Sequence, residues 1–393
     1  MAGLAYLWLS DNMLEGSLKT ELGNLANLEF LLVRNNRFTG TIPELYFDQL
    51  SNLVYFDVSQ NSFSGPLPSD VSKWKKLRYL FLDENLFTGT IPATYEALPD
   101  LEAFYANRNQ LTGTLSAEFG AWSKMSDLDL SENGLSGTLP TEWGAMTALG
   151  KFYLHANQLT GNLPSEYSSW SEMQFMQISY NRFSGAIPSE WSAMTDLEVF
   201  FASQNLLTGE LPAELGSWSK LWSFSADANA LSGVLSPQWG QLTALEALVL
   251  SDNILTGNLP PDFGSWSNMR NFLLDRNALS GPLPDDYESW SKVQNIVLLE
   301  NALEGTLPSN WRKMADLKVI NLGQNQLFGT LPSSFREWRS IRNLYLLENA
   351  LSGSFPNEWG ALTSLERIYL ATNFFTGTLP SVWGNLTELK ELW

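Results

Sequence analysis

The stretch LSENGLSGTLPTEWG, residues 130–144, contains the spacing that decides the fold. Its asparagine recurs every 24 residues, with one step of 25, so that sixteen similar segments follow one another. Apolar residues lie three, five and eight positions before each asparagine, and glycine lies four positions after it. A fixed period of this length indicates a repeat architecture. The asparagines are Asn12, Asn36, Asn61, Asn85, Asn109, Asn133, Asn157, Asn181, Asn205, Asn229, Asn253, Asn277, Asn301, Asn325, Asn349 and Asn373.

Each column of the repeat has a physical reason. Alternating apolar residues before the asparagine, such as Leu128 and Leu130, predict a short strand with one buried face. The asparagine amide is suited to backbone groups that a tight turn leaves without partners, so the stacked asparagines form a structural ladder. The glycine tolerates unusual backbone angles, and a proline seven positions after the asparagine stiffens the turn. The strands are therefore expected to stack in parallel.

LSENGLSGTLPTEWG and LVLSDNILTGNLPPDFG (248–264) resemble the leucine-rich repeat family, in its 24-residue plant-specific class. The arcs EWSAMTDLE (190–198) and LPSEYSSWSEM (163–173) also resemble repeats of trypanosomatid surface antigens and proteophosphoglycans. The first resemblance implies an α/β solenoid that occupies residues 1–393 as a single domain. The solenoid that this resemblance implies is a curved superhelix with one concave parallel sheet and short 3-10, helical or irregular convex arcs.

Two irregularities modify this expectation. The one-residue insertion near TIPELYFDQL (41–50) is expected to bulge the convex arc of its coil. Both ends of the array lack a polar cap, because Leu4 already lies in the first strand and LTELKELW (386–393) stops inside a seventeenth. Because solenoid coils cannot bury their own faces, we expect either a part of a longer chain or copies that associate head to tail.

Composition excludes several functions. The chain has no cysteine and one histidine, His155, which leaves no thiolate, multi-histidine zinc or Ser-His-Asp site. The formal charge of −19 argues against nucleic-acid partners, and no apolar run is long enough to insert into a membrane. An acidic column nine positions after the asparagine either attracts divalent cations or caps the following helical turn, and we favour the caps. We expect no enzyme activity, no cofactor and no metal.

The concave strand face is the expected binding surface, because repeat proteins commonly bind there. Its outward columns are unusually aromatic in the first five coils, and neighbouring strands bring such rings within reach of one another. A patch of this kind indicates an interface with protein or with sugar rings, although the rings could instead only stiffen the sheet or lie under a missing N-terminal cap. The predicted binding residues are Tyr6, Trp8, Phe30, Leu32, Tyr55, Tyr79, Phe81, Tyr105 and Tyr153.

The sequence thus predicts a non-enzymatic recognition and adhesion module, extracellular or at a cell surface, that binds protein or glycan. If it is secreted, we expect its signal sequence and its anchor to lie outside this chain. The alternative is a structural solenoid that assembles end to end or laterally into a coat or filament. A minor alternative is ice binding through the ladder of Thr and Ser three and five positions after the asparagine. The single sequon, Asn385-Leu386-Thr387, predicts a possible glycan at Asn385.

Tryptophan alternates between two positions of the arc, ten and thirteen after the asparagine. Thirteen repeats have one tryptophan in this pair and none has two. Trp143 is followed by Met146, whereas Tyr167 precedes Trp170. Because cores tolerate swaps that conserve volume and resist overpacking, the sequence predicts that both positions pack into the core and compensate one another.

Overall fold

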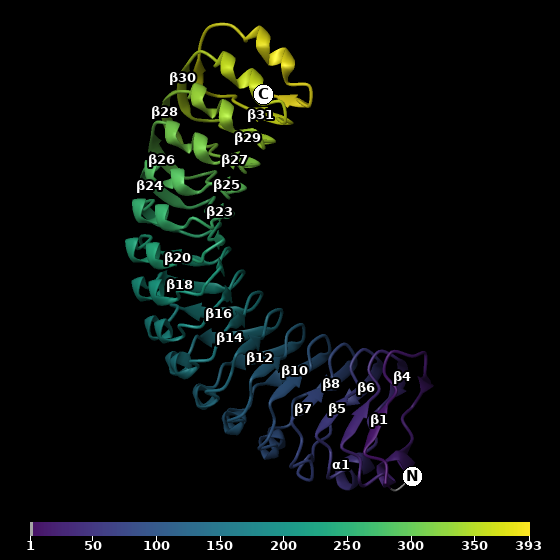
Figure 1. Ribbon diagram of the computed structural model, residues 1–393. Coiled ribbons are helices and arrows are strands. Elements are labelled where there is room, and N and C mark those ends of the chain that lie inside the picture. The colour runs from purple at the N-terminus through teal and green to yellow at the C-terminus, as the bar shows by residue number, and fades with distance from the viewer. Residues whose placement is uncertain (1–2) are drawn as a thin grey trace. The chain divides into compact units, whose positions relative to one another are not determined.

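The computed structural model describes residues 3–393, and these form two compact units, unit 1 (Met1–Leu197) and unit 2 (Glu198–Trp393). Each unit is built from stacked coils of 24 residues, one of which has 25, and most coils contain two short strands and a helical arc. Within residues 3–393, the segment between β6 (Ser62–Pro66) and β7 (Tyr79–Phe81) has turns in place of a helix. In unit 2, the helices lie along the outer side of the ribbon and strands β23 to β29 along the inner side (Figure 1). None of the helices in residues 3–393 is long and apolar enough to span a membrane.

The predicted strands before each asparagine form the primary sheet, which is parallel and in register within each unit. The strands of unit 1 are β1 (Tyr6–Trp8), β3 (Phe30–Leu32), β5 (Tyr55–Asp57), β7 (Tyr79–Phe81), β9 (Ala103–Tyr105), β11 (Asp127–Asp129), β13 (Lys151–Tyr153) and β15 (Phe175–Gln177). Those of unit 2 are β17 (Val199–Phe201), β19 (Ser223–Ser225), β21 (Ala247–Val249), β23 (Asn271–Leu273), β25 (Asn295–Val297), β27 (Val319–Asn321), β29 (Asn343–Tyr345), β31 (Arg367–Tyr369) and β33 (Glu391–Leu392).

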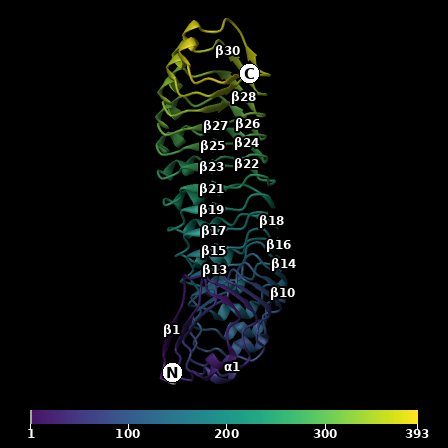
Figure 2. The ribbon, with the colours of Figure 1, turned by 90° about the vertical axis from the view of Figure 1, so that its right-hand side faces the viewer.

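A second parallel ladder follows the asparagine, where the sequence predicted turns. Its strands in unit 1 are β2 (Glu15–Gly16), β4 (Arg37–Gly40), β6 (Ser62–Pro66), β8 (Leu86–Gly89), β10 (Gln110–Thr114), β12 (Gly134–Thr138), β14 (Gln158–Asn162) and β16 (Arg182–Gly185). Those in unit 2 are β18 (Leu206–Glu210), β20 (Ala230–Ser232), β22 (Thr256–Asn258), β24 (Ala278–Pro282), β26 (Ala302–Gly305), β28 (Gln326–Thr330), β30 (Ala350–Gly353) and β32 (Phe374–Phe375). Figure 2 shows the two ladders of unit 2 as adjacent columns, β19 to β27 beside β22 to β28.

The convex arcs are one-turn helices that mostly begin directly after the repeat proline. In unit 1 they are η1 (Thr20–Asn24), α1 (Leu45–Gln49), η2 (Ala93–Ala97), η3 (Ala117–Ala121), η4 (Thr141–Ala145), η5 (Ser165–Ser169) and η6 (Ser189–Ala193). In unit 2 they are η7 (Ala213–Ser217), η8 (Pro237–Gln241), η9 (Pro261–Ser265), η10 (Asp285–Ser289), η11 (Ser309–Lys313), η12 (Ser333–Glu337), η13 (Asn357–Ala361) and η14 (Ser381–Asn385).

The insertion near residues 41–50 changes the arc of its own coil. The other helices are of the 3-10 type, whereas α1 is an α-helical turn closed by a bond from the Leu50 N–H to the Tyr46 carbonyl at 3.0 Å. An α-turn takes one more residue per hydrogen-bonded ring than a 3-10 turn. The extra residue is therefore absorbed in the arc, where the sequence placed it.

Most of the asparagines join two coils, whereas Asn12 in the first coil bonds to carbonyls of its own turn. The Asn253 amide donates to the carbonyls of Leu250 at 3.1 Å and Ser251 at 3.3 Å in its own turn, and to Ala226 of the preceding coil at 3.0 Å. Its carbonyl oxygen accepts the Leu231 N–H at 2.9 Å. The residue before every asparagine has a positive φ, between 50° and 59°, although none of the sixteen is glycine. The ladder thus holds a backbone conformation that side chains disfavour.

The glycine four positions after the asparagine is required for two reasons. At Gly137, φ is 81°, a region that other residues rarely adopt. A β-carbon there would lie 2.8 Å from Cγ2 of Thr114 in the preceding coil. The methyl groups of the threonine ladder therefore pack on the glycines of the next coil.

The arc tryptophans are buried, and at each of the two positions the indole N–H donates a hydrogen bond to a backbone carbonyl. At the first position, Trp143 Nε1 donates to the Ser116 carbonyl at 2.8 Å. At the second, Trp170 Nε1 donates to the Trp143 carbonyl at 3.0 Å. Both acceptors lie 27 residues earlier, in the preceding coil. A tryptophan at the second position stacks on the aromatic residue at the first, with ring centroids 3.9 Å apart for Tyr167 and Trp170.

Candidate functional site

The aromatic rings of the first four coils form one continuous row on the primary sheet of unit 1. Parallel pairing in register places Tyr6 beside Phe30, Phe30 beside Tyr55, and Tyr55 beside Tyr79. The ring centroids of these successive pairs are 4.8, 6.0 and 5.2 Å apart. Strands about 4.8 Å apart bring such rings into contact. We call this row, together with Trp8 and Leu32, the aromatic shelf.

Two further rings extend the row toward β9. Phe81 meets Tyr55 edge-on at 5.3 Å and Tyr105 at 5.0 Å. Tyr153, the last predicted binding residue, makes no ring contact with the others in the described chain, because Asp129 on β11 lies between Tyr105 and Tyr153. The structure therefore brings together all the predicted residues except Tyr153.

Exposure differs along the aromatic shelf. Trp8 is 75% and Tyr6 63% exposed, whereas the rings from Phe30 onward are half-buried because each covers the next. The Tyr79 hydroxyl donates to Glu102 at 2.9 Å, and the Arg78 guanidinium lies over the Tyr79 ring at 5.3 Å. These contacts fix the ring of Tyr79 before any ligand arrives.

Two open hollows lie along this row. The first, of about 430 Å³, is lined mainly by the aromatic shelf. The second, of about 420 Å³, is more polar, and we call it the acid groove. The residues lining the first are Tyr6, Trp8, Ser10, Asp11, Phe30, Leu32, Arg34, Tyr55 and Asp57. Those lining the second are Arg34, Tyr55, Asp57, Ser59, Gln60, Phe81, Asp83, Glu84, Tyr105, Asn107 and Asp129.

Burial raises the pKa of three of the carboxyl groups in the acid groove. Burial raises the pKa of Asp57 and of Asp129, although each carboxylate accepts both the N–H and the hydroxyl of a serine two residues later. Burial, together with the nearby Asp57 charge, raises the pKa of Asp83 to about 7. Asp83 is therefore partly protonated near neutral pH.

The basic side chains around the groove have side-chain partners other than Asp57, Asp83 and Asp129. Arg108 lies 3.3 Å from Glu84 and 2.9 Å from Glu132. The Arg34 Nε donates to Gln60 at 3.3 Å. Asp57, Asp83 and Asp129 belong to no ion pair within residues 3–393. The concave face thus presents carboxyl groups without a directly bonded cation.

The sequence prediction missed this acidic component. The signal was available, because Asp57 and Asp129 interrupt the same column that supplies Trp8, Phe81 and Tyr105. What the column could not show is how far neighbouring rings would bury these carboxyl groups. The consequence for their pKa depends on that burial.

Unit 2 has a smaller aromatic cluster that the sequence prediction also omitted. Tyr345 meets Tyr369 edge-on at 4.9 Å, and Tyr369 stacks on Trp393 at 4.8 Å. The hollow beside them measures about 350 Å³. The cluster involves three coils, whereas the row in unit 1 runs through five.

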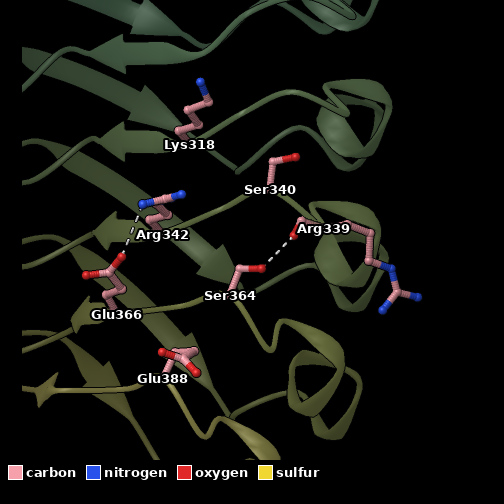
Figure 3. Close-up of a pocket in the computed structure, with 7 residues that line it drawn as sticks. All are labelled: Lys318, Arg339, Ser340, Arg342, Ser364, Glu366 and Glu388. Atoms are coloured by element: carbon pink, nitrogen blue, oxygen red, sulfur yellow. Dashed lines mark hydrogen bonds and ion pairs between the residues drawn. The ribbon is translucent and has the colours of Figure 1, made fainter.

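A fourth hollow, of about 460 Å³, lies between the primary sheet and the arcs of unit 2 (Figure 3). Its basic groups already have partners: Lys318 Nζ donates to Gln294 at 2.9 Å, and Arg342 lies 3.5 Å from Glu366. The guanidinium of Arg339 points away from the other labelled residues. Two carboxylates, Glu366 and Glu388, also line this hollow and offset most of the positive charge that an anionic ligand would need.

The Thr and Ser ladder belongs to the second sheet and has structural contacts. Hydroxyls three positions after the asparagine donate to the glycine carbonyl of the preceding coil, as Thr160 does to Gly137 and Thr256 to Gly233, both at 3.2 Å. These bonds explain the ladder without a ligand, and ice binding stays a prediction. Asn385 is exposed at the end of η14, and its glycosylation also stays a prediction.

The acidic column of the arcs gives no metal centre. Within residues 3–393 no three His, Asp or Glu side chains are grouped to hold a metal ion. The Nδ1 of His155 is buried without a hydrogen-bond partner, and its Nε2 lies 4.0 Å from Glu132. The histidine is thus partly enclosed.

Comparison with known proteins identifies the repeat. The Leucine Rich Repeat family model matches residues 27–48, 52–74, 124–146, 244–266 and 316–338. The solved structure of the Arabidopsis receptor kinase HAESA, in complex with the peptide hormone IDA and the co-receptor SERK1, is 31% identical with a TM-score of 0.92. The match covers 99% of this chain and 69% of that one. The chain belongs to the leucine-rich repeat family.

Two other structures are similar to this leucine-rich repeat protein. The plant peptide hormone receptor RGFR1 in complex with RGF2 is 30% identical, with a TM-score of 0.97 over 99% of this chain and 62% of that one. The ectodomain of the Arabidopsis receptor kinase GASSHO1/SCHENGEN3 in complex with CASPARIAN STRIP INTEGRITY FACTOR 2 is 29% identical, with a TM-score of 0.86 over 99% and 50%. This chain therefore spans between half and two thirds of their length.

A search of curated protein sequences gave no match. The comparisons support the plant-specific class of leucine-rich repeat and its curved α/β solenoid. They do not test the resemblance of the arcs to trypanosomatid repeats, which stays a prediction.

Proposed function

We propose that this leucine-rich repeat protein is an extracellular recognition module that binds a peptide or protein segment along the aromatic shelf and acid groove of unit 1. The observation that carries the proposal is the row of contacting rings from Tyr6 to Tyr105. Contiguous apolar surface of this kind on a protein marks an interaction site. Its rings are already in contact, so little conformational entropy is lost when a ligand binds.

The similar structures support a peptide rather than a glycan. HAESA is described in complex with a peptide hormone, and RGFR1 as a peptide hormone receptor. A peptide also suits a long, shallow surface, because an extended chain spans about 3.3 Å per residue and a few residues would cover the row. Glycan binding, adhesion and self-association stay predictions.

The test is selection of a displayed library of random hexapeptides against the whole chain, followed by calorimetry with the selected synthetic peptides. Changing Tyr79, Phe81 and Tyr105 together to Ser should abolish binding while the circular dichroism spectrum remains that of the parent. The matched control is Val249→Ser with Leu273→Ser, at paired positions on β21 and β23 in unit 2. Equal binding by both variants would place the site elsewhere. A glycan array run in parallel would detect a sugar ligand.

A further inference from the structure

The aromatic shelf and the acid groove meet at Arg34, Tyr55 and Asp57, which line both hollows. We infer that the ligand is an extended peptide in which an arginine or lysine enters the acid groove while a neighbouring apolar side chain lies on the aromatic shelf. This inference rests on the proposed function, because it specifies the chemistry of the same ligand.

Charge complementarity is the first argument. The acid groove is lined by four carboxyl groups and one basic side chain, Arg34. Glu84 is paired with Arg108, but Asp57, Asp83 and Asp129 belong to no ion pair within the described chain. Asp57 and Asp129 each accept two hydrogen bonds from a serine, but no cation within the described chain offsets the cost of burying their charge. A basic ligand side chain supplies the compensation, whereas an acidic ligand would meet like charge.

An unpartnered acceptor in the same groove is the second argument. The side-chain Oδ1 of Asn107 is buried and has no hydrogen-bond partner. Carbonyl oxygens in this situation are rare, since buried polar atoms are nearly always bonded to protein or water. Guanidinium and ammonium groups carry only donors, so a basic ligand side chain suits a lining that offers mainly acceptors.

The rings around the groove are the third argument. Tyr55, Phe81 and Tyr105 stand next to the carboxyl groups and line the groove wall. Aromatic faces attract cations, and an arginine gains most from being placed between rings and carboxylates. A neutral sugar would stack on the same rings but would leave the carboxyl groups without a counter-charge.

Protonation supplies a signature of this binding mode. Asp83 faces Asp57 and Arg34 from the preceding coils, Glu84 in its own turn, and Tyr105, Asn107 and Arg108 from the following coil. Its pKa of about 7 leaves it partly protonated at neutral pH, and a bound cation favours the ionised form. Binding at pH 7 should therefore release protons, and affinity should fall between pH 8 and pH 6.

The experiment uses the same displayed hexapeptide library and the whole chain. Peptides selected on the parent protein should be enriched in arginine or lysine beside an aromatic or aliphatic residue. On the variant Asp57→Asn with Asp83→Asn, the apolar preference should persist and the basic preference should be lost. Glu348→Gln, an exposed residue of unit 2, is the matched control for loss of a negative charge.

Calorimetry with one selected synthetic peptide gives the magnitude. Replacing its basic residue by glutamine, or using the double Asn variant, should weaken binding about tenfold to a hundredfold, the usual range for a charge-assisted hydrogen bond. Titrations in two buffers of different ionisation enthalpy should show proton release at pH 7 for the parent and none for the double variant.

The outcomes separate this inference from the proposed function. Selected peptides without a basic residue, or equal binding by the parent and the double Asn variant, would overturn the inference and leave the proposed function standing. Failure to select any peptide would count against both. Circular dichroism distinguishes a folded double variant from an unfolded one. If the double variant is unfolded, the inference is tested on the parent protein by comparing the selected peptide with the peptide in which glutamine replaces the basic residue. Equal affinity for the two peptides would overturn the inference.

Discussion

The two tryptophan positions of the arc permit a test of the packing by a double-mutant cycle in the coil of Trp143 and Met146. Both side chains are completely buried, and the Trp143 indole donates to the Ser116 carbonyl at 2.8 Å. Met146→Trp adds an indole beside the existing one. Overpacking of this kind costs about 1–3 kcal/mol of unfolding free energy.

The reverse single change also destabilises. Trp143→Phe removes the indole hydrogen bond, about 1 kcal/mol, and leaves a small cavity worth about 1–2 kcal/mol more. Independent effects would add, so the double variant would then lose about 3–6 kcal/mol.

The structure predicts a different result for Trp143→Phe with Met146→Trp. This combination reproduces the Phe119/Trp122 and Phe263/Trp266 pairs, in which the ring centroids stack at 4.4 and 3.9 Å. The relocated indole would donate to the residue 27 positions earlier, as Trp170 does. The double variant should therefore lie within about 1 kcal/mol of the parent, which corresponds to a coupling energy of about 2–5 kcal/mol.

The measurement is urea denaturation followed by far-ultraviolet circular dichroism, with amide hydrogen exchange in residues 141–149 as the local probe. Fluorescence is unsuitable because the number of tryptophans changes. Met146→Leu is the conservative control and should cost less than about 1.5 kcal/mol. A double variant as unstable as the sum of the two single variants would refute compensation between the positions.

Three further predictions concern the turns and the groove. Asn253→Ala should lower the unfolding free energy by about 2–4 kcal/mol, because it leaves buried backbone groups without hydrogen bonds. Asn12 is exposed, so Asn12→Ala should cost far less, and urea denaturation of the two variants makes the comparison. Ala228→Gly should raise the thermal midpoint, because φ is 51° and relief of this strain is worth about 1 kcal/mol; a lower midpoint would contradict it. Asp83→Asn should stabilise the protein by about 1–3 kcal/mol at pH 8 and have little effect near pH 4 in denaturation curves at each pH.

The sign of the Asp83 effect follows from proton binding. The pKa in the folded protein is about 7, above the ordinary value of 3.8, so the folded state binds more protons than the unfolded state between these values. Stability must then fall as pH rises through this window, and the amide variant removes that loss. A variant that stabilises equally at pH 4 and pH 8 would show that burial of the charge is not the cause.

The repeat spacing was enough to predict the coil, the primary sheet and the change of arc at residues 41–50, because each rests on a pattern repeated along the chain. The second ladder was not predicted. Its strands are short and contain the glycine of the repeat, and glycine disfavours strands when a sequence is considered alone. Pairing between coils supplies what local propensity lacks, since Gly137 faces Leu159 across two strands in register.

For the candidate site, the repeat columns predicted which residues share a face, but not the contacts that bury them. The spacing of the aromatic residues was enough to assign them to one face of the sheet. The same spacing also shows Asp129 between Tyr105 and Tyr153, which is why Tyr153 is separated from the other rings. The acid groove depends on something the columns do not contain: how completely neighbouring rings exclude water from a carboxyl group. A pKa near 7 at Asp83 is a property of three successive coils rather than of one residue.

This distinction bears on where specificity resides. The shelf rings cover one another and present a broadly apolar surface, and apolar contact discriminates weakly among side chains of similar size. Buried carboxyl groups and the free Oδ1 of Asn107 discriminate strongly, because a ligand without donors leaves them unpaired. The shelf should therefore contribute most of the binding energy, and the acid groove should decide which peptide binds. Changes at Tyr79 or Phe81 should weaken all ligands alike, whereas changes at Asp57 or Asp83 should alter which ligand is preferred.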